Sequence, residues 1–189
     1  MAAMATSIEN ALGKREGFDY TWANSTERTA ETSMTAGSRG YQQDTKETYY
    51  FDSSWVVVYK PRTAWTPVLT NINVGSGGTA IGSYELNGSM CTAQIKITLG
   101  TSPSVSSAAQ SNVPINVQDY TERGGNVYLR SSTTYVDTSA GTTTIGAIDA
   151  NSSTSVRFRL NNGDTVTGTA PFSWANGDII YAVMEYRYR

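Results

Sequence analysis

The chain has 189 residues, of which 39% are hydrophobic and 16% are charged, and its net charge is −2. This length suits one ordinary domain, or one domain with an attachment segment. The near balance of 14 basic and 16 acidic residues argues against a nucleic-acid partner. The sequence contains no run of 18 apolar residues, so no membrane span is predicted. The lack of histidine excludes histidine-based triads and most zinc sites.

The composition favours β-structure. Ser and Thr make up a quarter of the chain, and there are 17 glycines. These residues weaken helices but suit strands that are joined by turns. A single cysteine allows no internal disulfide. We therefore expect an all-β fold.

Residues 1–33 differ from the rest and are predicted to be an attachment segment with one or two helical turns. One turn is expected at Ser7–Leu12, and another after Asn24, which stands three residues before Glu27 as in a capping box. The large apolar side chains of the segment alternate as in a strand: Phe18, Tyr20 and Trp22. Because so short a stretch cannot bury these rings alone, we expect them to pack on a partner chain, in an anchor or subunit interface.

Residues 34–62 are predicted to form a small β-meander. Glu47–Phe51 and Trp55–Tyr59 are rich in aromatic and β-branched residues, and the turn between them predicts a hairpin. Lys60-Pro61-Arg62 is expected to end the second strand and to serve as a linker.

Residues 63–189 are predicted to form a head, a jelly-roll-like antiparallel β-sandwich. Gly75-Ser76-Gly77-Gly78 is expected to be a flexible loop, and Asn87-Gly88 a type I′ hairpin turn. After this turn Cys91, Ala93, Ile95, Ile97 and Leu99 alternate with polar residues, as in a half-buried strand. Residues 100–112 are expected to be a Ser-rich loop. Further strands are expected at Val127–Leu129, Thr142–Ile148 and Val156–Leu160.

The last eleven residues form the strongest strand pattern of the chain. One face would carry Ile180, Ala182, Met184, Tyr186 and Tyr188. The opposite face begins with Ile179, Tyr181 and Val183. A strand that is apolar on both faces is typically buried on both. Ile179, Tyr181 and Val183 are therefore our candidates for a subunit interface, which would be a trimer interface under the resemblance given below.

No catalytic, cofactor-binding or metal-binding residue is predicted. Without histidine, the remaining acids and bases are carboxylates such as Asp119, Glu122, Asp164 and Asp178, whose positions suit turns. Cys91 is expected to be a small buried residue. An aromatic cluster is interpreted as hairpin packing, with a sugar-stacking platform as the alternative: Tyr49, Tyr50, Phe51, Trp55 and Tyr59.

Several short motifs follow one another along the chain. In the N-terminal half they are Gly17-Phe18-Asp19-Tyr20-Thr21-Trp22-Ala23-Asn24, Arg28-Thr29-Ala30, Met34-Thr35-Ala36-Gly37, Gly40-Tyr41-Gln42-Gln43-Asp44-Thr45 and Tyr49-Tyr50-Phe51-Asp52-Ser53-Ser54-Trp55. In the C-terminal part they are Trp65-Thr66-Pro67, Val74-Gly75-Ser76-Gly77-Gly78, Tyr84, Asn87-Gly88, Leu99-Gly100, Asn112-Val113-Pro114 and Pro171-Phe172-Ser173-Trp174-Ala175-Asn176-Gly177-Asp178. This order resembles the minor tail and fibre proteins of tailed phages that infect actinobacteria, although Asp52-Ser53-Ser54 replaces their usual Gly-Ser before the tryptophan.

The resemblance implies a homotrimer with an N-terminal virion anchor and an outward β-rich head, and it transfers no catalytic residue. We predict a structural virion protein of the tail-fibre or baseplate type, assembled in the host cytoplasm. Its expected partners are other virion proteins, namely tail or baseplate proteins or the major capsid protein, and a host cell-wall glycan is a further candidate. A trimeric capsid decoration or head-fibre protein and a carbohydrate-binding module are the alternatives. An enzyme such as a glycan depolymerase is least favoured.

Overall fold

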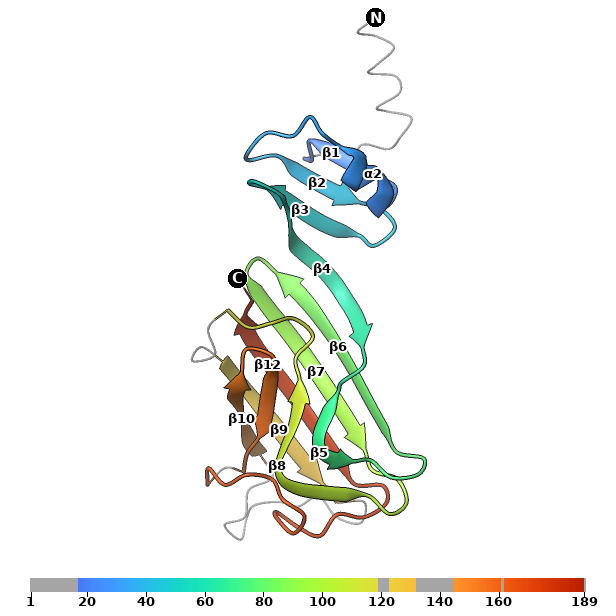
Figure 1. The fold of residues 1–189 in the computed structure, drawn as a ribbon, viewed down its shortest axis with the longest axis vertical. Helices are drawn as coiled ribbons and strands as arrows, with labels where there is room; N and C mark the ends of the chain where they lie inside the picture. The colour runs from blue at the N-terminus through green and yellow to red at the C-terminus, as the bar shows by residue number, and fades with distance from the viewer. Residues whose placement is uncertain (1–16, 119–122, 132–144, 161, 189) are drawn as a thin grey trace, which may run out of the picture. The chain divides into compact units, whose positions relative to one another are not determined.

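The computed structural model describes residues 17–118, 123–131, 145–160 and 162–188, and it divides the chain into two compact units (Figure 1). Unit 1 holds the N-terminal residues through Pro61 together with Leu86–Gly88. Unit 2 holds Arg62–Glu85 and Ser89–Arg189. The predicted turn at Ser7–Leu12 lies outside the described residues.

Unit 1 is a small sheet with one short helix. Its strands lie in the order β1 (Tyr20–Trp22), β2 (Arg39–Gln42), β3 (Glu47–Phe51) and β4 (Trp55–Trp65), with β1 parallel to β2 and the other pairs antiparallel. Helix α2 spans Ser25–Ala30. Its N-cap is Asn24, whose Oδ1 accepts from the backbone N–H groups of Thr26 and Glu27, so the predicted helix start is confirmed.

The expectation that the rings of residues 18–22 need a partner chain is wrong for Trp22. Trp22 is only 4% exposed within its own chain, and its ring contacts Trp55 and Tyr49 edge to face at 4.8 Å and 6.0 Å between centroids. The indole lies over Gly40, where a Cβ would come within 2.1 Å of the ring. The stretch buries this ring because β1 pairs with β2 and so extends the meander. The alternation indicated a strand here but not its pairing partner.

The strand end predicted at Lys60-Pro61-Arg62 is wrong, because β4 runs through all three residues. The division between the two units nevertheless falls inside this predicted linker, between Pro61 and Arg62. The register of β3 and β4 shifts between Thr48 and Tyr49, so the cross-strand partners are Tyr49 with Val57 and Thr48 with Tyr59. This bulge turns Lys60 onto the face of Glu47, with which it forms a salt bridge. Pro61 lies beyond the last residue of β4 that pairs with β3, a position where a missing N–H is tolerated.

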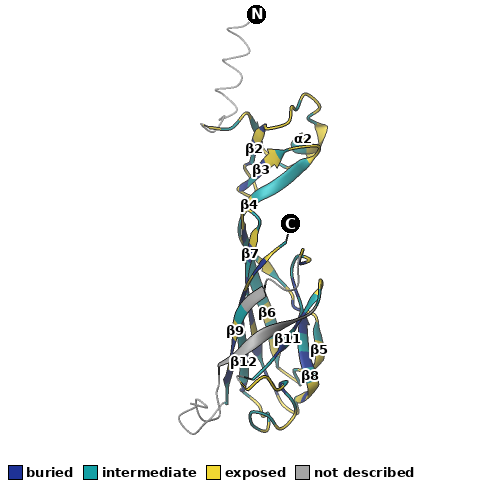
Figure 2. Cartoon of the chain, turned by 90° about the vertical axis from the view of Figure 1, so that its left-hand side faces the viewer, coloured by how far each residue is buried: buried dark blue, intermediate teal, exposed yellow. Residues whose placement is uncertain are grey.

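Unit 2 is an antiparallel β-sandwich, so the predicted fold class is confirmed. One layer contains β6 (Thr79–Asn87), β7 (Met90–Thr98), β12 (Ile179–Arg187) and β9 (Arg123–Arg130), and the other contains β11 (Ser155–Phe158), β8 (Ser104–Asn112) and β5 (Leu69–Asn73) (Figure 2). Strand β10 (Ile145–Ser152) pairs with β9 and with β11, and so joins the layers.

The core of unit 2 lies between the layers and follows the predicted alternation. In β7 the side chains of Cys91, Ala93, Ile95 and Ile97 are completely buried. Strand β12 pairs with β7 over its whole length, and its own inward residues are at most 1% exposed: Ile180, Ala182, Met184 and Tyr186. The opposite layer contributes further buried side chains, among them Val105, Ala109, Val156 and Phe158. Burying such aliphatic and aromatic side chains stabilises each by about 1.5–3 kcal/mol.

Two predicted loops of unit 2 are ordered structure. Most of the expected Ser-rich loop is strand β8, which pairs with β5 and β11. The glycine-rich segment at 75–78 packs closely on Gly100: Gly100 N–H donates to the Val74 carbonyl at 2.6 Å, and Ser76 and Thr101 exchange two backbone hydrogen bonds. These glycines allow a close approach of backbones and do not mark a flexible segment.

The hairpin between β6 and β7 is present, but its turn is not the predicted type I′. The two residues between the strands are Gly88 and Ser89, and only Gly88 has a positive φ, of 61°. A positive φ at the first central residue alone is the pattern of a type II′ turn. The prediction centred the turn one residue too early, because Asn87 is the last residue of β6.

We expect Gly88→Val to lower the free energy of unfolding by about 1–3 kcal/mol, the usual cost of holding a side chain in a strained backbone region. The effect should come from the backbone alone, since no atom outside the two adjacent residues lies within 4 Å of the Cβ position. Urea denaturation followed by circular dichroism measures it. Thr98→Ser, a conservative change on the outer face at the far end of β7, should melt with the parent. Equal stability of both variants would contradict this account of the turn.

Candidate functional site

The candidate site is the outer face of the layer formed by β7, β12 and β9. Because side chains alternate along a strand, the residues between the buried positions of β12 point away from the core. They are Ile179, Tyr181 and Val183, the predicted trimer-interface residues, and all three are half-buried. The structure thus brings the three together on one surface.

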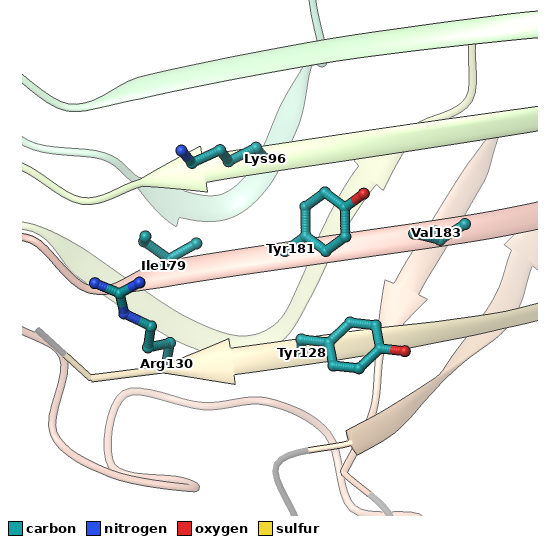
Figure 3. Close-up of a pocket in the computed structure, with 6 residues that line it drawn as sticks. All are labelled: Lys96, Tyr128, Arg130, Ile179, Tyr181 and Val183. Carbon is teal, nitrogen blue, oxygen red and sulfur yellow. The ribbon is translucent and has the colours of Figure 1, made fainter. Parts of the chain in front are cut away.

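The register of the three strands adds neighbours that the sequence analysis missed. Lys96 of β7 and Tyr128 of β9 flank Tyr181, and Arg130 of β9 is paired with Ile179. Figure 3 shows Lys96 on one side of β12 and Arg130 on the other, with Ile179 between them. Alternation could have placed each of these side chains outward on its own strand, but only the pairing of β7 and β9 with β12 brings them together.

These six residues line a shallow depression of about 550 Å³: Lys96, Tyr128, Arg130, Ile179, Tyr181 and Val183. Its floor is apolar and aromatic. The rings of Tyr128 and Tyr181 lie 6.1 Å apart and tilted by 36°, and Tyr128 is 42% exposed. Both charged residues of the depression are cations, although the chain as a whole carries a net charge of −2.

A second open surface lies in unit 1, on the sheet face that α2 does not contact. Helix α2 packs on the side of Gln42 and Tyr49, where Arg28 lies 4.5 Å from the Tyr49 ring and donates to Gln42. The opposite side carries two cross-strand rows, which we call the tyrosine face: Arg39, Tyr50 and Val56, then Tyr41, Thr48 and Tyr59.

The tyrosine face separates the predicted aromatic cluster into two groups. Tyr49, Phe51 and Trp55 belong to the packed side, as the interpretation of hairpin packing requires, whereas Tyr50 and Tyr59 are 43% and 46% exposed. Phe18 joins the open side, since its ring lies 5.6 Å from that of Tyr41 and beneath Arg39. Of the predicted anchor residues, Phe18 and Tyr20 are half-buried and Trp22 is a core residue.

The carboxylates that the sequence analysis assigned to turns lie as follows where the structure describes them. Asp178 is buried, and its carboxylate accepts from the Ala175 N–H at 2.7 Å. Asp164 lies in an exposed turn, where it contacts Asn162. Asp119 and Glu122 lie outside the described residues. Burial raises the pKa of the Cys91 thiol to about 11, opposed in part by a hydrogen bond with Tyr186, so this thiol is protonated at neutral pH.

The described part of the chain holds neither a cluster of metal-binding side chains nor a helix that could span a membrane. No three His, Cys, Asp or Glu side chains lie close enough together there to hold a metal ion. Among those same residues, no helix has the length and apolar character needed to cross a membrane. Comparison with known proteins was also negative, since no family model, no curated protein and no solved structure matches the chain.

Proposed function

We propose that the chain is a structural virion protein of a tailed phage, of the trimeric tail-fibre or baseplate type. In this proposal unit 1 attaches the protein to the particle and unit 2 is the outward β-sandwich head. The order of motifs along the chain supports the proposal, because each N-terminal motif builds a part of unit 1. Gly37 takes a positive φ of 96°, Gly40 receives the Trp22 ring, and Trp55 packs against both Trp22 and Phe51.

The observation that carries the attachment role is the tyrosine face. It presents several tyrosines and one arginine on an open sheet surface, and its exposed rings are those of Tyr50 and Tyr59. Tyrosine and arginine are enriched in protein–protein interfaces, because they combine a large apolar area with hydrogen-bonding groups. A surface of this composition fits a contact with another virion protein better than it fits solvent.

The test is incorporation of variants into phage particles. The double change Tyr50→Ala and Tyr59→Ala should reduce the amount of protein in purified particles at least about tenfold, since exposed aromatic anchors commonly dominate an interface. Ile81→Ala is the matched control, because Ile81 is a large apolar residue that is also exposed but lies in unit 2, outside the depression described above. Incorporation equal to the parent in the double variant would exclude the tyrosine face as the anchor.

Point variants are preferable to removal of residues 1–33. That deletion would take away β1 and α2, and with them the Trp22 ring that packs on Tyr49 and Trp55. Loss of incorporation would then reflect unfolding of unit 1 as much as loss of an anchor. Tyr50 and Tyr59 lie on the other face of the sheet and are 43% and 46% exposed, so the result of the double variant reports on attachment.

The trimer is tested separately by analytical ultracentrifugation of the purified chain. A stable monomer at micromolar concentration would contradict the trimeric type. Gold labelling of particles gives the location, and labels on the shell would assign the protein to the capsid decoration alternative. Complete absence of the protein from purified particles would reject the virion function.

A further inference from the structure

We propose that the depression on the outer face of β7, β12 and β9 binds an acidic saccharide. In this arrangement a sugar ring packs on Tyr128 and Tyr181, and its carboxylate or phosphate group is held by Lys96 and Arg130. As an account of contact with a host surface, the inference rests on the proposed function. The binding itself can be measured on the isolated chain.

The size and lining of the depression fit a small ligand. Its volume of about 550 Å³ lies within the range of sites for small molecules, which are mostly apolar with a few polar groups that fix orientation. Here Ile179, Val183 and the two tyrosine rings supply the apolar surface. The ring hydroxyls and the two cations supply the polar groups, and they come from three different strands.

The charge of the site selects an anion. Lys96 and Arg130 approach the depression from β7 and β9, which are separated by β12 and therefore lie about 10 Å apart. Long side chains from both can reach a group above Ile179, and a guanidinium can bind a carboxylate or phosphate through two parallel hydrogen bonds. In a chain of net charge −2, this local pair of cations is not a general property of the surface.

The strand pairing favours a saccharide over an acidic peptide. Strand β12 is hydrogen-bonded to β7 on one side and to β9 on the other, so it offers no backbone edge for an added strand. Only side chains are available for recognition. The neighbouring tyrosine rings present apolar faces to the C–H groups of a sugar ring and hydroxyls to its oxygens.

Isothermal titration of the full chain with tetragalacturonic acid tests the proposal, with cellotetraose as the neutral probe and glucose 6-phosphate as the phosphate probe. We expect tetragalacturonic acid to bind and cellotetraose to bind at least about tenfold more weakly. Raising the salt concentration from about 50 to 300 mM should weaken the binding of tetragalacturonic acid. Binding of glucose 6-phosphate would identify phosphate as an accepted acidic group, and its failure to bind would restrict the site to carboxylates. Equal binding of the acidic and neutral tetrasaccharides would overturn the assignment.

Variants locate the binding. Lys96→Gln and Arg130→Gln should each weaken binding of tetragalacturonic acid at least about fivefold, and Tyr128→Ala should do the same through lost packing. The control is Lys46→Asn, which removes one exposed positive charge from unit 1 and suits its positive φ of 58°. A loss in the control as large as that in Lys96→Gln would mean non-specific attraction and would reject the site.

The experiments also distinguish two other possible occupants of this face, an acidic protein and a second copy of the chain. Hexaglutamate that binds as tightly as tetragalacturonic acid would identify a contact for an acidic protein and contradict a saccharide site. If the parent is a trimer and Val183→Glu is a folded monomer, the face belongs to the subunit interface and the inference is overturned. Lys96→Gln should still enter phage particles, so a parent that binds saccharide but never enters particles would reject the proposed function alone.

Discussion

Gly100→Ala is expected to destabilise unit 2 by about 3 kcal/mol or more, because overpacking against fixed backbone is among the costliest single changes. A Cβ at Gly100 would come within 2.1 Å of the Ser76 carbonyl oxygen and 2.4 Å of the Gly78 nitrogen. Neither atom belongs to a flexible side chain that could move aside. Urea denaturation followed by circular dichroism should show a lower midpoint.

Gly77→Ala is the matched control in the same loop. Gly77 has a positive φ of 76°, but no atom lies within 4 Å of its Cβ position. Its replacement should therefore cost only the backbone strain of an alanine in that region, about 1 kcal/mol. Equal losses for the two variants would show that the loop relaxes freely, and would contradict the close backbone contact between the loop and Gly100.

The role of these glycines could not be predicted from the sequence alone. A run of glycine and serine has two physical meanings, because a missing side chain permits either free rotation or close approach. The contact that decides between them lies more than twenty residues away, at Gly100. The Ser-rich strand β8 poses the same difficulty: its two partners, β5 and β11, are distant in the sequence, and its alternation is interrupted at Ala108, which has a positive φ of 61°.

Strands with regular alternation were predictable because each carries its own evidence. In β7 and β12 the apolar residues recur at every second position, and the structure buries that face in both. In unit 1 the bulge between β3 and β4 was not predictable, since it depends on how the two strands pair. That single irregularity is what places Lys60 on the same face of the sheet as Glu47.

For the same reason, only half of the residues that line the candidate site could be predicted from the sequence. The outward residues of β12 could be read from one strand, whereas Lys96, Tyr128 and Arg130 lie near them only through the register of three strands. In unit 1, the distinction between a packed Tyr49 and an exposed Tyr50 also needed the position of α2. A sequence of adjacent aromatic residues does not reveal which face a helix will cover.

The bulge produces the second large expected effect, at Glu47. This residue is only 6% exposed, and its carboxylate accepts hydrogen bonds from the Lys60 ammonium and the Tyr49 hydroxyl. Burial alone would raise the pKa of Glu47, but the hydrogen bonds from Lys60 and Tyr49 and the charge of Lys60 outweigh it and hold the pKa below 4.5. The carboxylate is therefore ionised in the folded protein at neutral pH.

This lowered pKa sets the direction of the pH dependence. A carboxyl group whose pKa is lower in the folded state stabilises that state above its unfolded value, near 4.5. The contribution is lost as the pH falls through the lower folded value. Thermal unfolding of unit 1 should therefore shift to lower temperature below about pH 4.5. In Glu47→Gln the part of this shift that comes from Glu47 should disappear, because an amide does not titrate.

Lys60→Met should lower the stability of unit 1 by about 2–4 kcal/mol at neutral pH, because it leaves the Glu47 carboxylate buried without its cation. Lys60 is itself 23% exposed at the side chain, so water can reach part of the site and the loss should fall short of that for a fully buried pair. The double variant Glu47→Leu and Lys60→Met is the critical comparison. It removes both charges and should be more stable than Lys60→Met alone, since an apolar pair carries no desolvation cost. With Trp65 and Trp174 of unit 2 both replaced by Phe in every variant, the fluorescence of Trp22 and Trp55 reports on unit 1 during urea denaturation. If Lys60→Met is at least as stable as the double variant, the buried Glu47 carboxylate does not need the Lys60 ammonium. The bulge that brings the two side chains together would then contribute little to the stability of the fold.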